Sequence, residues 1–126
     1  MKRAIQTHYR RIIAAALLAI ILSGFACPTQ AATAIEKKAF NILTSTLGLS
    51  PAAACGIMGN IKAETDFRSD IVGMGGSYGI CQWLGLRLSA LHSFCRSNGY
   101  DASTLRGQLY YMKHELDTIF PGWENI

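Results

Sequence analysis

Apolar residues recur at helical spacing in four segments of the chain, and glycine or proline separates one segment from the next. The pattern predicts helices over residues 35–47, from 51 to 63 or 64, over 84–97, and from 101 or 103 to just before Pro121. Ser50 and Pro51 are typical of a helix start, and Asn98-Gly99 is typical of a helix end. We therefore expect a mainly α fold, a small domain of about four helices.

The second predicted helix and the segment after it are rich in glycine. Gly56 and Gly59 lower helix propensity, so we expect them to let another backbone or a ligand come close. From Thr65 to Gly79 the helical periodicity is lost, which predicts a Gly-rich loop or short hairpin before the third helix. The third helix is predicted to carry Leu84, Leu88, Leu91 and Cys95 on one face.

The amino-terminal segment has the pattern of a secretory signal peptide. Lys2, Arg3, Arg10 and Arg11 precede an uncharged apolar run from Ile12 to Ala26, and small residues follow it. This run is shorter than the roughly 20 residues that a membrane-spanning helix needs. Cleavage after Ala31 or after Ala34 fits, so we assign residues 1–34 to the signal and 35–126 to the functional domain. We expect an exported protein, periplasmic or extracellular, that meets the membrane only through this segment before cleavage.

Removal of the signal changes the charge balance. The full chain has a net charge of +4, but four of its twelve basic residues lie within the first 11 residues. From Ile35 onward the chain has eight basic and eight acidic residues, which gives a net charge of zero. A nucleic-acid partner would need a clustered basic face, so we expect none. The roughly 90 residues after the signal suffice for one small domain with one core.

Three cysteines follow the signal, and their state stays open. Export would allow one disulfide among Cys55, Cys81 and Cys95, whereas three buried thiols would equally serve as small apolar residues. A zinc site that adds His92 lacks any Cys-x-x-Cys pair. The sequence therefore predicts no metal and no cofactor.

One carboxylate at the end of the second predicted helix has the surroundings of a general acid. Cleaving a glycosidic bond requires a proton for the leaving oxygen, and a carboxylic acid supplies it best when apolar neighbours raise its pKa toward neutrality. Ile61 lies one turn before Glu64, and Phe67 lies three residues after it. Asn60 shares a helical face with Glu64 and could bond the carboxyl group or a sugar hydroxyl. The alternative is that Glu64 is a solvated residue at a helix end.

The turn from Ser77 to Trp83 supplies groups that suit a sugar ligand. Gly79 permits close approach, the Gln82 amide both donates and accepts hydrogen bonds, and aromatic rings offer flat apolar faces. The residues expected to bind substrate opposite Glu64 are Asn60, Ser77, Tyr78, Gly79, Gln82 and Trp83. Alternatively, Trp83 is a core side chain and Gln82 caps the third helix.

Four parts of the chain carry a resemblance to a known family. The sequence resembles the phage tail lysozyme family in Ala54–Glu64, Ser77–Trp83, Arg87 and Gln108–Leu116. It is more distantly similar to soluble lytic transglycosylases and goose-type lysozymes. The resemblance implies a lysozyme-like α fold and cleavage of the MurNAc–GlcNAc linkage in peptidoglycan glycan strands. It also implies Glu64 as general acid, with the 77–83 turn lining the glycan groove.

Two departures from the family pattern leave alternatives open. Thr65 and Asp66 follow the acid where relatives often carry Ser and a small or polar residue, and the chain stops at Ile126, soon after the fourth helix. One alternative is therefore a non-catalytic peptidoglycan-binding or assembly module. Another is a cell-wall thiol peptidase that uses Cys81 with His92 or His114. Because the motifs mark only one carboxylate, intramolecular attack by the muramoyl hydroxyl, as in lytic transglycosylases, is favoured over hydrolysis.

Overall fold

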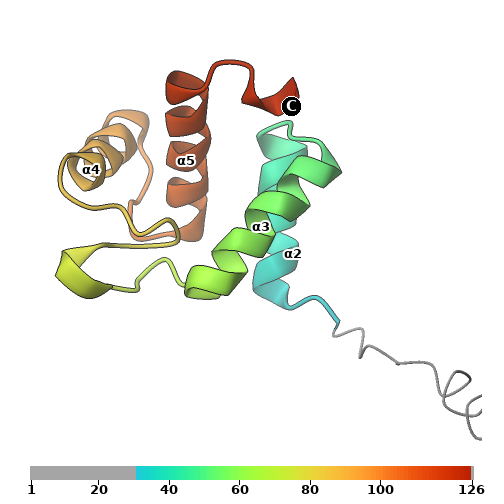
Figure 1. Cartoon of the computed structure of the whole chain (residues 1–126), viewed down its shortest axis with the longest axis horizontal. Coiled ribbons are helices and arrows are strands. Elements are labelled where there is room, and N and C mark those ends of the chain that lie inside the picture. Colours follow the sequence, from blue (N-terminus) through green and yellow to red (C-terminus); the bar gives the residue numbers. More distant parts are fainter. Residues whose placement is uncertain (1–30, 126) are drawn as a thin grey trace, which may run out of the picture. The chain divides into compact units, whose positions relative to one another are not determined.

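The computed structural model describes residues 31–125, and this part is mainly helical (Figure 1). Its elements are α2 (Ala34–Asn41), a π-helical turn (Ile42–Thr46), α3 (Pro51–Thr65), a 3-10 turn (Met74–Gly76), α4 (Leu86–Asn98), α5 (Leu105–Ile119) and a final 3-10 turn (Trp123–Asn125). The predicted small α domain with four helical segments is confirmed. Most of the predicted signal segment, residues 1–30, lies outside the described residues.

Local side chains set where the first two helices begin. Thr33 and Glu36 form a capping box on α2, in which the Glu36 carboxylate accepts the Thr33 N–H at 2.6 Å and the Thr33 hydroxyl accepts the Glu36 N–H at 3.3 Å. Ser50 caps α3 by accepting the Ala53 N–H at 3.2 Å, and Pro51 follows as the first helical residue. The helix start predicted at Ser50 and Pro51 is confirmed.

Two predicted boundaries are wrong by at least two residues. The third helix, α4, begins at Leu86, because the chain turns at Gly85, which has a φ of +56°. Leu84 thus lies before the helix and is half exposed, so it does not belong to the buried face of α4. The fourth helix, α5, begins at Leu105, because the hydroxyl of Thr104 accepts a backbone N–H of its first turn.

Helix α5 lies between α4 on one side and the pair α2 and α3 on the other (Figure 1). Apolar side chains from every helix meet around it; the core includes Ala39, Leu43, Ala54, Ile61, Leu91, Cys95, Leu109 and Met112. An ion pair between Glu36 and Lys62 joins α2 to α3. Its hydrogen bond lowers the pKa of Glu36 to about 2, so this carboxylate is charged at neutral pH.

The chain between α3 and α4, residues 66–85, forms the short irregular hairpin that the glycines predicted. Isolated β-bridges pair Val72 with Tyr78 and Tyr78 with Trp83. The hairpin passes the N-terminal end of α5, where the fully buried side chain of Gln108 forms hydrogen bonds with it. Its Oε1 accepts the Ile80 N–H at 2.9 Å, and its Nε2 donates to the carbonyls of Ser69 and Ala102 at 2.8 Å each. One amide thus binds both arms of the hairpin and the α4–α5 connection.

Gly79 is the residue that lets Gln108 come so close. A Cβ added at Gly79 would lie 2.4 Å from Oε1 of Gln108 and 2.6 Å from its Nε2. Gly79 also has a φ of +72°, a conformation that side-chain-bearing residues rarely adopt. The close approach that the sequence suggested at this glycine is therefore to a protein side chain.

Replacing Gly79 with Ala should destabilise the protein more than replacing Gly75 with Ala. Both glycines have a φ of +72°, so both substitutions carry a left-handed strain of roughly 1 kcal/mol. At Gly75, however, no atom lies within 4 Å of an added Cβ, whereas at Gly79 the Cβ collides with Gln108. We expect Gly79→Ala to cost about 1–3 kcal/mol more in urea unfolding. Equal losses would show that Gln108 does not constrain this turn.

Candidate functional site

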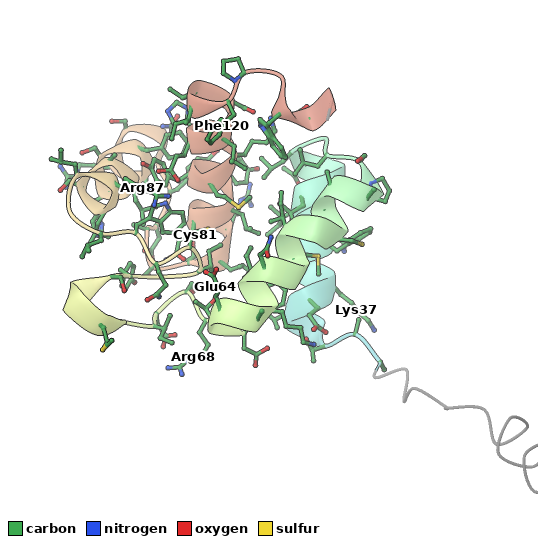
Figure 2. The ribbon with its side chains drawn as sticks, in the orientation of Figure 1. Lys37, Glu64, Arg68, Cys81, Arg87 and Phe120 are labelled. Carbon is green, nitrogen blue, oxygen red and sulfur yellow. The ribbon has the colours of Figure 1, made fainter. Side chains whose placement is uncertain are left out.

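A pocket of about 500 Å³ lies between α3, the hairpin and α5. It is lined by Ile57, Asn60, Ile61 and Glu64 of α3, Ile80 and Cys81 of the hairpin, Arg87 of α4, and Met112, Glu115 and Leu116 of α5. Figure 2 shows Glu64, Cys81 and Arg87 from three different elements along this pocket. The pocket therefore joins the end of the predicted catalytic helix to charged groups that are remote in the sequence.

Glu64 lies in the last turn of α3, with its side chain exposed to the pocket. The next residue, Thr65, is buried and donates its hydroxyl to the carbonyls of Ile61 at 3.1 Å and Ile80 at 3.4 Å. Asp66 and Phe67 then turn the chain in left-handed conformations, and the Phe67 ring enters the core. The end of the helix is thereby tied to the hairpin, which fixes where Glu64 points.

A second carboxylate, Glu115, lines the same pocket. Its side chain is only 11% exposed and accepts three hydrogen bonds, from Arg87 Nε at 2.6 Å, Arg87 Nη2 at 2.8 Å and Trp83 Nε1 at 3.0 Å. These donors, the Arg87 guanidinium above all, hold the pKa of Glu115 below its usual value. The pocket therefore pairs an exposed carboxyl group with one that is held in its charged form.

Trp83 does not lie on a groove wall as expected. Its side chain is fully buried, and its ring packs at a tilt against Tyr111 with centroids 5.5 Å apart. The structure thus shows the alternative position, in the core. The indole N–H still bears on the site, because its bond to Glu115 supports that carboxylate from behind.

The other residues of the 77–83 turn bond mainly to one another. Gln82 accepts the Ser77 hydroxyl at 2.6 Å and donates to the Gly79 carbonyl at 2.8 Å, so its amide stabilises the turn and caps no helix. Tyr78 stacks on His92 with ring centroids 6.2 Å apart. From this turn only Ile80 and Cys81 line the pocket beside Glu64, and of the six residues expected to bind substrate only Asn60 does so.

Arg87 and Glu115 are pocket residues for which the sequence alone predicts no role. Both residues belong to segments that carried the family resemblance, but 28 positions separate them. A local pattern cannot show that such a pair meets. Their presence in those segments was the one signal available.

The geometry around Cys81 does not favour a thiol peptidase. Burial raises the pKa of this thiol to about 12, so it stays protonated and is a weak nucleophile at neutral pH. Within the described residues, no histidine bonds to it: His92 stacks on Tyr78, and His114 stacks on Phe94 at 4.7 Å. Cys81 contributes a pocket wall without an evident base.

The cysteines match neither sequence interpretation in full. Cys55, Cys81 and Cys95 are all free thiols, and Cys55 is exposed. Among residues 31–125, no group of three His, Cys, Asp or Glu side chains is placed to hold a metal ion. Over the same range, no helix combines the length and apolar character that crossing a membrane requires.

Comparison with known proteins gives one match. A family model described as phage tail lysozyme matches residues 34–125, which include every helix of the described part of the chain and every residue that lines the pocket. No curated protein and no solved structure matches the chain.

Lowering the pH should remove the stabilisation that Glu115 provides. Its pKa in the folded protein lies below the ordinary value of 4.5, so the charged form favours folding. This contribution is complete above the unfolded pKa and is lost as the pH falls through the folded pKa. We expect Glu115→Gln to lower the free energy of unfolding more at pH 7 than at pH 3. In an Arg87→Gln background this difference between the two pH values should be smaller. A loss that stays constant between these pH values would contradict the assignment.

Proposed function

Because the chain belongs to the phage tail lysozyme family, we propose that it cleaves the MurNAc–GlcNAc linkage of peptidoglycan with Glu64 as general acid. Family membership points to a lysozyme-like, peptidoglycan-related function. The observation that supports the finer assignment is that Glu64 lines, together with the apolar Ile57 and Ile61, a pocket whose volume suits a ligand site.

The residues around Glu64 suit a sugar at the scissile bond. The carboxyl group donates its proton to the glycosidic oxygen as the C1–O bond breaks. Asn60, one turn earlier on α3, offers an amide to hydroxyl or acetamido groups, while Ile57 and Ile61 provide an apolar wall. The charged Glu115 in the same pocket stabilises the positive charge that develops at the anomeric carbon.

We propose intramolecular attack as the second half of the reaction. Glu115 is a weak base because its pKa is lowered and both of its oxygens accept hydrogen bonds, and neither Asp66 nor Asp70 lines the pocket. The muramoyl C6 hydroxyl then forms the new bond to C1 and gives its proton to the Glu64 carboxylate. The product is an anhydro sugar, and Glu64 returns to its acid form.

Glu64→Gln should remove most cleavage of purified sacculi without unfolding the protein. The amide cannot donate the proton, and general acid catalysis contributes roughly 10²–10⁴-fold, so we expect a loss of that size. Asp66→Asn is the matched control, since Asp66 is a nearby acid outside the pocket lining and Asn tolerates its left-handed backbone. Turbidity loss measures activity, and circular dichroism checks the fold.

Each outcome of this experiment separates the candidate functions. Full cleavage by a folded Glu64→Gln protein would overturn the glycosidase proposal. Cys81→Ala should stay active, and its selective inactivation would favour the peptidase. Glycan binding without any cleavage by the wild type would indicate the binding module. Mass spectrometry of the released muropeptides should show anhydro ends; products heavier by one water would replace intramolecular attack with hydrolysis.

We also propose export with cleavage after Ala31. Ala34 fits the same small-residue pattern, but cleavage there would remove Thr33 and its capping box from α2. Loss of an N-cap costs about 0.5–2 kcal/mol, so the earlier position preserves the folded domain better. The mature protein recovered from the periplasm or medium should begin at Ala32 when sequenced from its amino terminus. A start at Ile35, or an uncleaved chain, would contradict this position.

A further inference from the structure

A second hollow, of about 490 Å³, lies where α4 and α5 face each other. We propose that it binds the glycan strand beyond the cleavage pocket, an inference that rests on the proposed function. Its lining includes Ser93, Phe94 and Ser97 of α4 and Tyr111, His114 and Glu115 of α5. Ser93 and Ser97 are four residues apart on α4, and Tyr111 is three and four residues from His114 and Glu115 on α5, so both helices turn one face to the hollow.

Aromatic rings form the apolar part of this hollow. Phe94 and His114 stack with centroids 4.7 Å apart, and Tyr111 packs at a tilt against Phe94 at 5.5 Å. Of these rings His114 is exposed and Phe94 is partly exposed, and together they offer an apolar surface of the kind on which the C–H face of a pyranose ring can pack. Phe94 is partly buried and Tyr111 is buried, so this surface is fixed by the core behind it.

Neutral polar groups surround these rings. Ser93, Ser97 and His114 are exposed, so their hydroxyls and ring nitrogens are open to sugar hydroxyl and acetamido groups. No Lys or Arg is among the lining residues, and the single carboxylate, Glu115, is already paired with Arg87. This chemistry favours a neutral saccharide over the charged peptide stem of peptidoglycan.

The two hollows meet at one side chain. Glu115 lines both of them, and its partner Arg87 lines the cleavage pocket. The Arg87–Glu115 ion pair therefore marks the boundary that a strand would cross between them. Figure 2 shows Arg87, in the first turn of α4, above Cys81. A short saccharide can occupy only one hollow, whereas a longer strand can occupy both. Affinity should then rise with strand length, because the second contact is intramolecular.

The test measures binding of chito-oligosaccharides by calorimetry in the Glu64→Gln background, so that cleavage cannot interfere. We expect the affinity to rise at least about tenfold from the tri- to the hexasaccharide. Ser93→Trp, which fills the hollow, should remove this gain and leave trisaccharide affinity unchanged. Arg96→Trp is the matched control, because Arg96 is an exposed residue of α4 that does not line the hollow. Melting temperatures check that both variants fold.

Loss of the length dependence only in Ser93→Trp would support the second glycan site. If affinity does not rise with oligosaccharide length, or if the rise persists in Ser93→Trp, this inference is wrong. Cleavage of sacculi by the wild type would then still support the proposed function. The opposite result is a length-dependent rise in affinity that Ser93→Trp removes, in a wild-type protein that never cleaves sacculi. That result would contradict the proposed function and support the second glycan site. Perturbation of the His114 ring signals in NMR spectra by peptide-bearing fragments alone would assign the hollow to the peptide stem and overturn the glycan.

Discussion

The buried amide of Gln108 is the contact on which the site depends. It satisfies three backbone groups from three different places, the two arms of the hairpin and the connection before α5. Each of these groups would cost about 1–3 kcal/mol if it were buried without a partner. The hairpin carries Ile80 and Cys81 into the pocket and Trp83 behind Glu115, so its position decides the shape of the pocket wall. Gly79 serves this contact by leaving room for the amide.

The ion pair between Arg87 and Glu115 matters more for positioning α4 against α5 beside the pocket than for the stability of the fold. Arg87 is more than half exposed, so solvent screens the pair and keeps its contribution to the folding free energy modest. Arg87 also lies in the first turn of α4, where a positive charge is unfavourable toward the helix dipole. Glu115 offsets that charge and connects α4 to α5 at the edge of the cleavage pocket. The same bond keeps Glu115 charged while Glu64 stays exposed and free of ion pairs within the described residues, so two carboxylates acquire different environments.

Local chemistry explains what could be read from the sequence. The start of α3 followed from Ser50 and Pro51, and the end of α4 followed from Asn98 and Gly99, because caps involve residues a few positions apart. The start of α4 was predicted two residues early, because its N-cap is Gly85, which has no side chain to mark a helix start. The start of α5 was also predicted early, although its cap, Thr104, is a local signal. Asn60 and Glu64 were placed together correctly because one helix carries both.

The sequence by itself determined the helices, the irregular hairpin, the family resemblance and the face of α3 that carries Glu64. Only the tertiary structure decided that Trp83 is buried, that Gln82 bonds within its own turn, and that Arg87 and Glu115 complete the pocket. Periodicity and capping act over a few residues, so the sequence records them directly. A buried indole or a pair 28 positions apart depends on how separate elements pack, and packing is a property of the whole core.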